Sequence, residues 1–344
     1  MGRYTPPLVA VIIALFGALL FATSANAAAT PNVCTDELSP PQTTSQLSQW
    51  MSGLPKGAIG CLHAGTYGDG GQVYVKPSSA GSSEDDRRKV RNYPGDLPSA
   101  VTINAGVYFS SSADYYTLRL LNVNGASLSD QTVGAPRGAN YIYLSDLDIT
   151  NENHDVIGCI AWGGDNLIVT RSRIHDCGSD THFDHCIYLG HGANAQVVSN
   201  VIFDCAAWAI HLYPGSVNSY VHNNVLASSG GGVTFGGESS GGCETTSYAR
   251  VENNAITNMN GGRDHDEAVT DYWSGCSPGV GNELNSNCFW GNSYGNAGVS
   301  SAISRSGNIS ADPLFGPGLT IAPLSGCYPL VGDPASVDHE VNLP

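Results

Sequence analysis

A stretch between Asn140 and Asn292 repeats one pattern about six times, and this repeat constrains the fold more than any other feature of the sequence. Each copy contains two or three short runs rich in Val, Ile and Tyr, which Gly, Asn, Asp and Ser separate. A fixed period of 24 to 32 residues is typical of a solenoid. Its first apolar column is predicted to contain Ile149, Ile174, Ile202, Leu226, Ile256 and Cys288. A second column follows at Ile160, Ile187, Ile210, Val233 and Val269.

Short strands with polar turns distinguish this repeat from helical repeats of similar period. Leucine-rich and helical-pair repeats need Leu-rich or Ala-rich helical stretches, and the sequence contains none in this region. Strands at this spacing fit a coil in which each copy forms one rung of a parallel β-helix. We therefore predict an all-β fold, a parallel β-helix, in which insertions enlarge the turns and leave the inward columns in register.

The chain begins with features of a secretory signal. Arg3 precedes an apolar run from Leu8 to Phe21, and Ala25-Asn26-Ala27 resembles a cleavage site. An uncleaved anchor is the alternative, but the run is short for a membrane span and no later stretch is apolar enough. We predict a secreted protein with residues 1–27 as signal peptide and 28–344 as one domain. That domain is divided into a cap (28–60), rungs (61–292) and a C-terminal cover (293–344).

The two ends of the repeat have predicted elements of their own. Residues 43–54 have capping Ser and Thr residues and apolar side chains at helical spacing, so we expect a short helix that covers the open end of the coil. Strands are expected at 56–62, 65–67, 101–104 and 116–120, and a return strand at 311–315. Residues 77–98 read as a loop, in which the basic run 87–91 is solvated and neutralised by Glu84, Asp85 and Asp86.

The charge balance excludes several partners. Without residues 1–27 the chain has 13 basic and 30 acidic side chains, a net charge of −17. Such a surface repels nucleic acid and anionic membranes, and the sequence contains no cluster of Lys and Arg with interleaved aromatic residues. We therefore expect neither nucleic acid nor a membrane as a partner, and we expect a monomer.

Ten cysteines in an exported chain predict disulfides. Stacked positions of a parallel coil lie about 4.8 Å apart, inside the range that a disulfide tolerates. The rung alignment stacks Cys177 on Cys205 and Cys159 on Cys186, which predicts these two pairs or a ladder of free thiols. The remaining predicted pairs are Cys34–Cys61, Cys243–Cys276 and Cys288–Cys327.

Three segments resemble known proteins. The helix followed by Gly65-Thr66-Tyr67, the strand Asp184-His185-Cys186-Ile187-Tyr188-Leu189 and the closing segment 311–315 resemble right-handed parallel β-helix proteins of the pectate-lyase superfamily. The resemblance is greatest to the secreted bacterial group with right-handed β-helix repeats and covers nearly the whole mature chain. It implies the right-handed fold. The superfamily includes lyases, hydrolases, epimerases, esterases and adhesins, so the fold does not choose a reaction.

Outward-facing residues of one column form the first candidate site. If Ile187 and Leu189 point inward, alternation turns Tyr188 outward, and the same count places His211 beside it. Thr234 and Thr270 follow on the next rungs. Imidazole titrates near neutral pH and a phenol can donate or accept a proton beside it, so the pair is a candidate acid/base couple. The alternative is a ladder of stacked structural side chains.

A second cluster contains His182, Asp184, His185 and His191, which could transfer protons or bind substrate. His185 shares parity with inward Ile187, so a buried residue at the strand start is the alternative. The spacing of these residues matches no zinc site.

Carboxylates form a third cluster. Asp264, Asp266, Glu267 and Asp271 are predicted calcium ligands, because calcium prefers hard oxygen atoms. They could also supply the paired carboxylates of a glycoside hydrolase, with Tyr272 and Trp273 stacked on a sugar. A solvated acidic loop remains the alternative, and whether calcium binds stays open.

These observations predict an enzyme that cleaves an extracellular polysaccharide. We assign Asp184, His185, Tyr188 and His211 to catalysis and His182, His191, Arg173, Tyr272 and Trp273 to substrate binding. Hydrolysis is favoured over β-elimination because acidic groups outnumber basic ones and no Lys follows Lys89. The Asp/Lys/Arg motif of lyases of this fold has no counterpart. Gly190-His191-Gly192 resembles the Gly-His-Gly of polygalacturonases, but the paired aspartates that precede it there are missing. A non-catalytic glycan-binding or adhesion protein is the alternative.

Overall fold

The computed structural model describes residues 33–128, 130–135, 138–154, 158–240, 242–261 and 267–334. The chain divides into two units, residues 1–33 and Cys34–Pro344, and all described helices and strands belong to the second. The predicted signal peptide, 1–27, lies outside the described residues.

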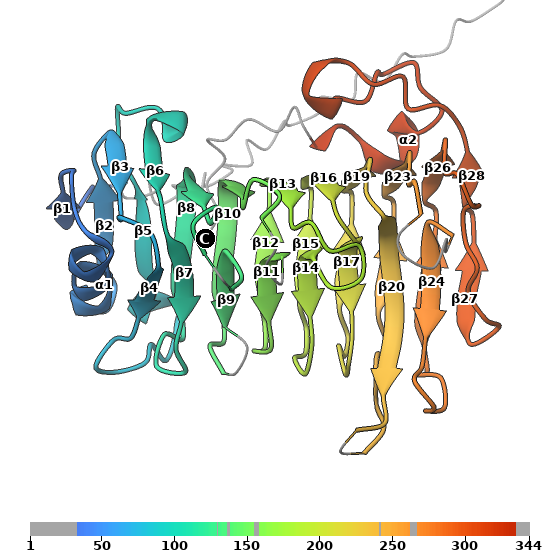
Figure 1. Ribbon diagram of the computed structural model, residues 1–344, viewed down its shortest axis with the longest axis horizontal. Helices are drawn as coiled ribbons and strands as arrows, with labels where there is room; N and C mark the ends of the chain where they lie inside the picture. Colours follow the sequence, from blue (N-terminus) through green and yellow to red (C-terminus); the bar gives the residue numbers. More distant parts are fainter. Residues whose placement is uncertain are drawn as a thin grey trace, which may run out of the picture. The chain divides into compact units, whose positions relative to one another are not determined.

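Nearly all described strands belong to two parallel sheets, which run side by side along the coil (Figure 1). Sheet A contains 19 strands: β1 Asp36–Leu38, β2 Ile59–Leu62, β3 Gly65–Tyr67, β5 Arg88–Asn92, β6 Val101–Ile103, β8 Tyr116–Asn124, β10 Ile142–Thr150, β12 Ile168–Thr170, β13 Arg173–Cys177, β15 Gln196–Val198, β16 Val201–Cys205, β18 Tyr220–His222, β19 Val225–Ala227, β22 Arg250–Glu252, β23 Ala255–Thr257, β25 Asn282–Asn285, β26 Cys288–Trp290, β27 Ile303–Ser306 and β28 Ile309–Ser310. Sheet B contains nine: β4 Gln72–Val75, β7 Gly106–Phe109, β9 Val133–Ala135, β11 Gly158–Trp162, β14 His185–Leu189, β17 Trp208–Leu212, β20 Gly231–Glu238, β21 Glu244–Thr245 and β24 Val269–Tyr272. Only β21 pairs antiparallel among them, with β20.

The fold is a right-handed parallel β-helix of about eight turns. From β12 onward, a typical rung contributes two short strands to sheet A and one to sheet B, and each strand pairs with its equivalent in the next rung. Strands also lie outside the predicted rung range of 61–292: β1 precedes it, β2 begins two residues before it, and β27 and β28 follow it.

The predicted inward columns are confirmed except at one position. The second column is in register throughout and fully buried, from Ile160 to Val269. The first column ends at Phe289, which pairs with Ile256, and Cys288 pairs with Ala255 one residue earlier. Since a shift of one residue reverses the direction of a side chain, Cys288 faces outward, where it bonds to Cys327.

A ladder of buried asparagines stabilises the turn between the two strands that each rung contributes to sheet A. The ladder contains Asn200, Asn224, Asn254, Asn287 and Asn308. Each Oδ1 after the first accepts hydrogen bonds from the backbone N–H and the Nδ2 of the ladder residue in the preceding rung, at 2.9–3.1 Å. The turn thereby satisfies backbone groups that no strand pairs.

All ten cysteines form disulfides, so the free-thiol alternative is wrong. The pairs Cys34–Cys61, Cys243–Cys276 and Cys288–Cys327 are confirmed. The other four cysteines pair differently from the prediction, as Cys159–Cys177 and Cys186–Cys205. Although Cys177 and Cys205 are neighbours in the ladder, stacked side chains point the same way and do not face each other. Cysteines at the corner between sheets A and B do face each other, with Cα atoms 5.5 and 5.4 Å apart.

The predicted helix is α1, Thr44–Gly53. Thr43 and Gln46 form a reciprocal capping box at its start. Leu47 and Met51 are fully buried in the core. The Ser48 hydroxyl accepts a hydrogen bond from the N–H of Tyr74, and the Ser52 hydroxyl donates to the Tyr74 carbonyl. The helix therefore satisfies backbone groups of β4, the first strand of sheet B.

The prediction of a solvated loop at 77–98 is wrong for the basic run, which forms β5. Arg87, just before β5, is 1% exposed because Glu84 pairs with its guanidinium group through two 2.6 Å hydrogen bonds and the Tyr143 ring lies 3.7 Å from it. Arg88 is also buried and donates to the Leu54 carbonyl. Charge therefore does not indicate exposure here, since both guanidinium groups are buried and donate to carbonyl or carboxylate oxygens.

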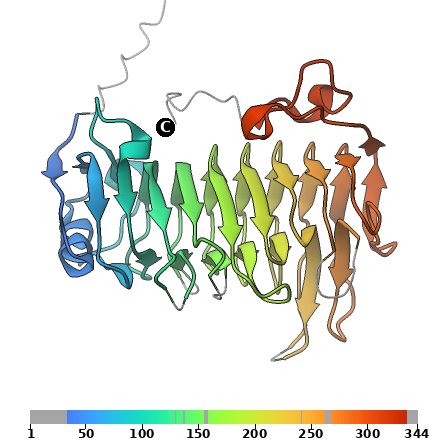
Figure 2. The same ribbon diagram turned by 45° about the horizontal axis from the view of Figure 1, so that its top comes forward.

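The C-terminal segment folds back over the outer side of sheet A (Figures 1 and 2). It contains the short helices η3, Pro317–Leu319, and α2, Tyr328–Val331, and residues 311–315 do not form the predicted strand. Ile321, Cys327 and Val331 bury against Val201 and Val225. In the described part of the chain, no helix is both long and apolar enough to cross a membrane.

Candidate active site

The outer face of sheet B brings the predicted pair together. Tyr188 on β14 and His211 on β17 are direct partners in the parallel ladder, and their rings lie 5.2 Å apart between centroids. The predicted Thr234 and Thr270 continue the same column on β20 and β24. The predicted alternation of the strands is therefore confirmed at these four positions.

His211 is only partly exposed, and its environment keeps the ring neutral. Burial, together with the charges of His185 and His182, holds the pKa of His211 well below its usual value. Its Nδ1 atom is buried without a hydrogen-bond partner. A neutral imidazole can accept a proton at its unprotonated nitrogen.

Tyr188 has the complementary property. Burial, followed by the charges of Tyr213 and Glu238, raises the pKa of Tyr188 to about 12. The phenol therefore keeps its proton at neutral pH. A neutral base and a protonated hydroxyl side by side form a proton-transfer pair without net charge.

His185 lies beneath this pair and is 3% exposed. Burial lowers the pKa of His185 to about 3, so the ring is neutral. Its Nδ1 accepts a 3.3 Å hydrogen bond from the N–H of Trp208, and its ring lies 4.1 Å from that of His211. The ring thus supports His211 from within the wall of the coil.

Asp184 is 2% exposed, and its carboxylate points back into the preceding turn. Its Oδ2 accepts hydrogen bonds from the N–H groups of Ser179 and Asp180, at 2.9 and 2.8 Å. This contact fixes the turn that leads into β14 and therefore the position of His185. The carboxylate is a positioning group in this geometry.

The predicted substrate-binding residues occupy several places around the pair. Tyr272 is 61% exposed and its ring lies 6.2 Å from Tyr213, which in turn stacks at 5.2 Å on His211. Trp273 is half-buried and donates to Asp271. His191 pairs with Glu244 at 2.6 Å, and His182 contacts the exposed Phe183.

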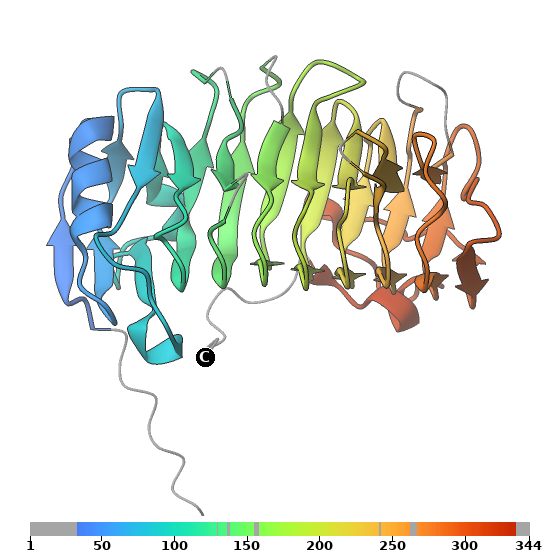
Figure 3. The same ribbon diagram turned by 90° about the horizontal axis from the view of Figure 1, so that it is seen from below.

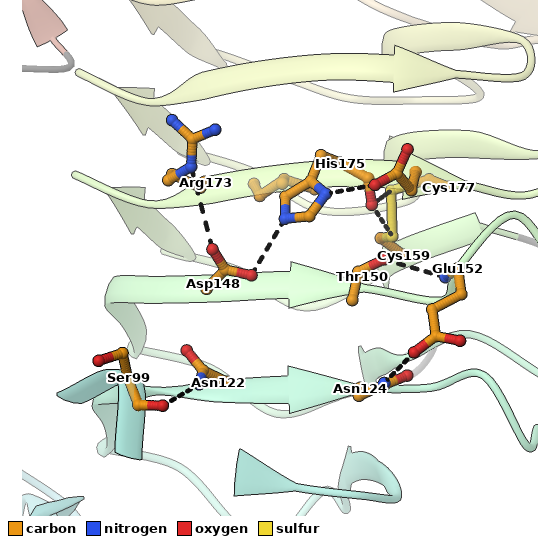
Figure 4. Close-up of polar contacts among 12 residues, drawn as sticks. Ser99, Asn122, Asn124, Asp148, Thr150, Glu152, Cys159, Arg173, His175 and Cys177 are labelled. Carbon is orange, nitrogen blue, oxygen red and sulfur yellow. Dashed lines mark hydrogen bonds and ion pairs between the residues drawn. A yellow bond between two sulfur atoms is a disulfide. The ribbon is translucent and has the colours of Figure 1, made fainter. Parts of the chain in front are cut away.

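Arg173 lies apart from this group, on β13 of sheet A (Figure 4). Its guanidinium group is 3.9 Å from Asp148 and donates to the Gly318 carbonyl of the C-terminal cover. On the same strand, His175 is held between two carboxylates, Asp148 at 3.0 Å and Asp176 at 2.7 Å. Arg173 therefore belongs to a separate polar cluster.

The predicted calcium ligands are only partly described. Asp264 and Asp266 lie outside the described residues. Glu267 lies against the backbone of Gly298, and Asp271 accepts hydrogen bonds from Trp273 and Ser300. Within the described ranges, no three His, Cys, Asp or Glu side chains gather closely enough to hold a metal ion.

Charge is distributed unequally between the two sheets. The strands of sheet B contain no Lys or Arg, whereas β5, β8, β13, β22 and β27 of sheet A do. Two side chains near the pair were missed from the sequence, Tyr213 and Glu238. Tyr213 could have been found by counting two positions beyond His211. Glu238 could not, because it lies at the end of β20, where this strand extends past its neighbours and beyond the regular repeat (Figure 1).

Comparisons with known proteins agree with the observed coil. A family described as "Right handed beta helix region" matches residues 102–255. No curated protein sequence matches the chain significantly. Among solved structures, the chain is similar to an alginate lyase from Paenibacillus sp. str. FPU-7, with a TM-score of 0.64 and 17% identity over 80% of this chain and 96% of that one. It is also similar to the pectate lyase Pel9A, with a TM-score of 0.53 and 10% identity over 80% of each chain. At these identities the likeness concerns the fold.

Proposed function

The chain is a right-handed parallel β-helix protein with the fold of alginate and pectate lyases, and we propose that it is an enzyme that cleaves a polysaccharide on the outer face of sheet B. The observation that carries the proposal is the Tyr188–His211 pair, in which a neutral imidazole lies beside a protonated phenol. Parallel strands present such side chains at a regular spacing that suits an extended polymer. Five disulfides are typical of an oxidising compartment, so we place the enzyme outside the cell.

Hydrolysis is the first candidate reaction. His211 Nε2 takes a proton from the attacking water, the bond between the sugar carbon and the departing oxygen breaks, and the Tyr188 hydroxyl gives its proton to that oxygen. The protonated His211 then returns the proton to Tyr188, which restores the pair. Because the strands of sheet B contain no Lys or Arg, nothing on them neutralises a uronate carboxylate, which favours a neutral polymer.

Elimination is the second candidate, and the position of Asp184 favours it. With this carboxylate bound to backbone N–H groups, the pair itself is Tyr and His without a carboxylate. In an elimination, His211 removes the proton beside the uronate carboxylate, the bond to the leaving sugar oxygen breaks, and Tyr188 protonates that oxygen. The product would carry a carbon–carbon double bond, and a bound calcium ion would have to neutralise the acidic substrate.

A panel of neutral and acidic polysaccharides, with and without calcium, tests the proposal. We expect new reducing ends without the ultraviolet absorbance of an unsaturated uronate. Activity should fall by roughly 10³-fold in His211→Ala and substantially in Tyr188→Phe. His222→Ala, which alters a half-exposed histidine on sheet A, is the matched control and should keep full activity.

Other outcomes have a defined meaning. Ultraviolet absorbance that rises with the reducing ends would replace hydrolysis by elimination. Binding without cleavage on every substrate would overturn the enzyme proposal and favour a glycan-binding protein. Full activity in His211→Ala would place the reaction elsewhere on the coil.

A further inference from the structure

The outward column that contains Tyr188 and His211 continues toward the N-terminal end of the coil. Moving away from the pair, successive strand partners of Tyr188 are Ala161, Gly134, Tyr108 and Tyr74. Two tyrosines therefore stand at the far end of the column, and two residues with almost no side chain separate them from the candidate active site. At about 4.8 Å per rung, Tyr108 lies about 14 Å from Tyr188.

A cavity of about 320 Å³ lies beside the far tyrosines, lined by Gly71, Gln72, Tyr74, Ser127, Leu128 and Asp130. Tyr74 is 55% exposed, and its ring lies 5.5 Å from that of Tyr108. Its hydroxyl donates to Gln72 Oε1 at 2.8 Å, and Gln72 Nε2 donates to Asp130 at 3.2 Å. An exposed aromatic ring is thus held rigidly beside an amide and a carboxylate.

Between Tyr108 and Tyr188 the column contains two small residues, and one polar side chain lies against it. The Gln131 amide lies across Gly134, where its Nε2 is 2.5 Å from the position that a β-carbon would occupy. Gln131 is 5% exposed, so its amide is fixed in place. Only glycine leaves room for that amide, and Ala161 adds only a methyl group on the next rung. Among the described strand residues, the column therefore presents only Gly134 and Ala161 between Tyr108 and Tyr188.

We propose that Tyr74, Tyr108, Gln72 and Asp130 form a distal sugar-binding subsite, which rests on the function proposed above. One pyranose ring stacks on the Tyr74 ring, and its hydroxyl groups bond to Gln72 and Asp130. The occupant is a neutral, extended chain of pyranose sugars that crosses the rungs along the column. Roughly three sugar residues span the distance to Tyr188. The carboxylate of Asp130 disfavours an acidic sugar at this position.

Affinity electrophoresis in gels that contain soluble galactomannan, xylan or polygalacturonate tests the subsite without requiring catalysis. Tyr74→Ala should weaken retardation by a neutral polymer roughly 3- to 10-fold, since stacking and one bonded ring are lost. Tyr248→Ala, which removes a similarly exposed ring elsewhere, should leave it unchanged. His211→Ala should migrate as the wild type does. In kinetics on the polymer, Tyr74→Ala should raise KM and leave kcat unchanged.

Failure of the subsite is distinguishable from failure of the proposed function. Equal retardation of Tyr74→Ala and wild type, or no retardation of the wild type in any gel, would overturn the subsite even if cleavage at His211 stands. Retardation that depends on Tyr74 but without cleavage of any polymer would support the subsite and reject the enzyme. Preference for polygalacturonate would overturn the assignment to a neutral sugar.

Discussion

At the residue scale, the same side chain acquires opposite properties from its partners. Burial is the largest cause that lowers the pKa of both His185 and His211. His175 is also largely buried, and burial alone would lower its pKa. The hydrogen bonds and charges of Asp148 and Asp176 outweigh that effect and raise the pKa of His175. The first two histidines therefore favour the neutral form, and the third binds its proton more strongly in a structural contact.

The raised pKa of His175 predicts a pH-dependent contribution to stability (Figure 4). A histidine whose pKa is higher in the folded than in the unfolded state stabilises the fold fully below its unfolded pKa of about 6.5. That stabilisation is lost as the pH rises through the folded pKa. His175→Asn should therefore lower the free energy of unfolding by about 1 kcal/mol near pH ~5.5 and by less near pH ~8.5.

Denaturant unfolding at the two pH values measures this difference. His222→Asn is the matched control for the loss of a sheet A histidine, because His222 stacks on Tyr220 and bonds to the uncharged side chain of Asn223. A loss for His175→Asn that grows toward high pH would contradict the assignment.

Sequence periodicity was sufficient to place Tyr188 beside His211, since strand alternation and rung spacing determine both positions. It was not sufficient for Asp184, whose neighbours along the strand suggest a carboxylate in the site. Its side chain instead satisfies two backbone N–H groups of the preceding turn. Local turn geometry of this kind has no periodic signal, and Glu238 was missed for the same reason.

At the element scale, the turns hold the rungs together as much as the strands do. The asparagine ladder recurs at one position of each rung, as the second residue of Asn223-Asn224 and Asn253-Asn254, for example. The Asn-Asn pairs can be seen in the sequence, but from the sequence alone an Asn predicts only a turn and not a ladder. The disulfide pairing could not be predicted fully for a similar reason. The alignment of the rungs identifies stacked cysteines but not the direction of their side chains.

Removal of one ladder residue should destabilise the whole coil. Asn254 is fully buried, and in Asn254→Ala the N–H of Asn224 and the Val221 carbonyl lose their partner. We expect a loss of about 2–4 kcal/mol in the free energy of unfolding. Asn122→Ala, on the partly exposed face of β8, is the matched control and should cost about 1 kcal/mol or less. Thermal unfolding of the two variants measures the difference. Equal losses would show that a ladder asparagine stabilises the fold no more than a partly exposed asparagine does.

The helix α1 acts on the same scale. Ser48 and Ser52 satisfy backbone groups of β4 that no strand pairs on that side. We propose that α1 covers this open edge, because an exposed edge is a template for pairing with another chain. Figure 3 shows α1 at the N-terminal end of the coil.

At the scale of the whole molecule, the two sheets differ in the residues that they carry and in what covers them. Five strands of sheet A contain Lys or Arg, and the C-terminal cover packs on part of the outer side of this sheet. The outer side of sheet B carries tyrosines, His211 and the small residues Gly134 and Ala161. Such a surface suits contact with a sugar polymer. The repeat predicted the parallel coil, and the family resemblance implied its right hand. The strand β5 was missed because it is rich in charged residues.

A double-mutant cycle on the cleaved polymer tests the central claim most directly, that His211 and Tyr188 act as one unit. The measured quantity is kcat/KM for the wild type, His211→Ala, Tyr188→Phe and the double variant, with Tyr248→Phe as control. If the pair acts together, each single change should lower kcat/KM by roughly 10²- to 10³-fold, and the double variant should lose little more than the worse single one. Losses that multiply in the double variant, or a Tyr188→Phe enzyme as active as the Tyr248→Phe control, would contradict the account.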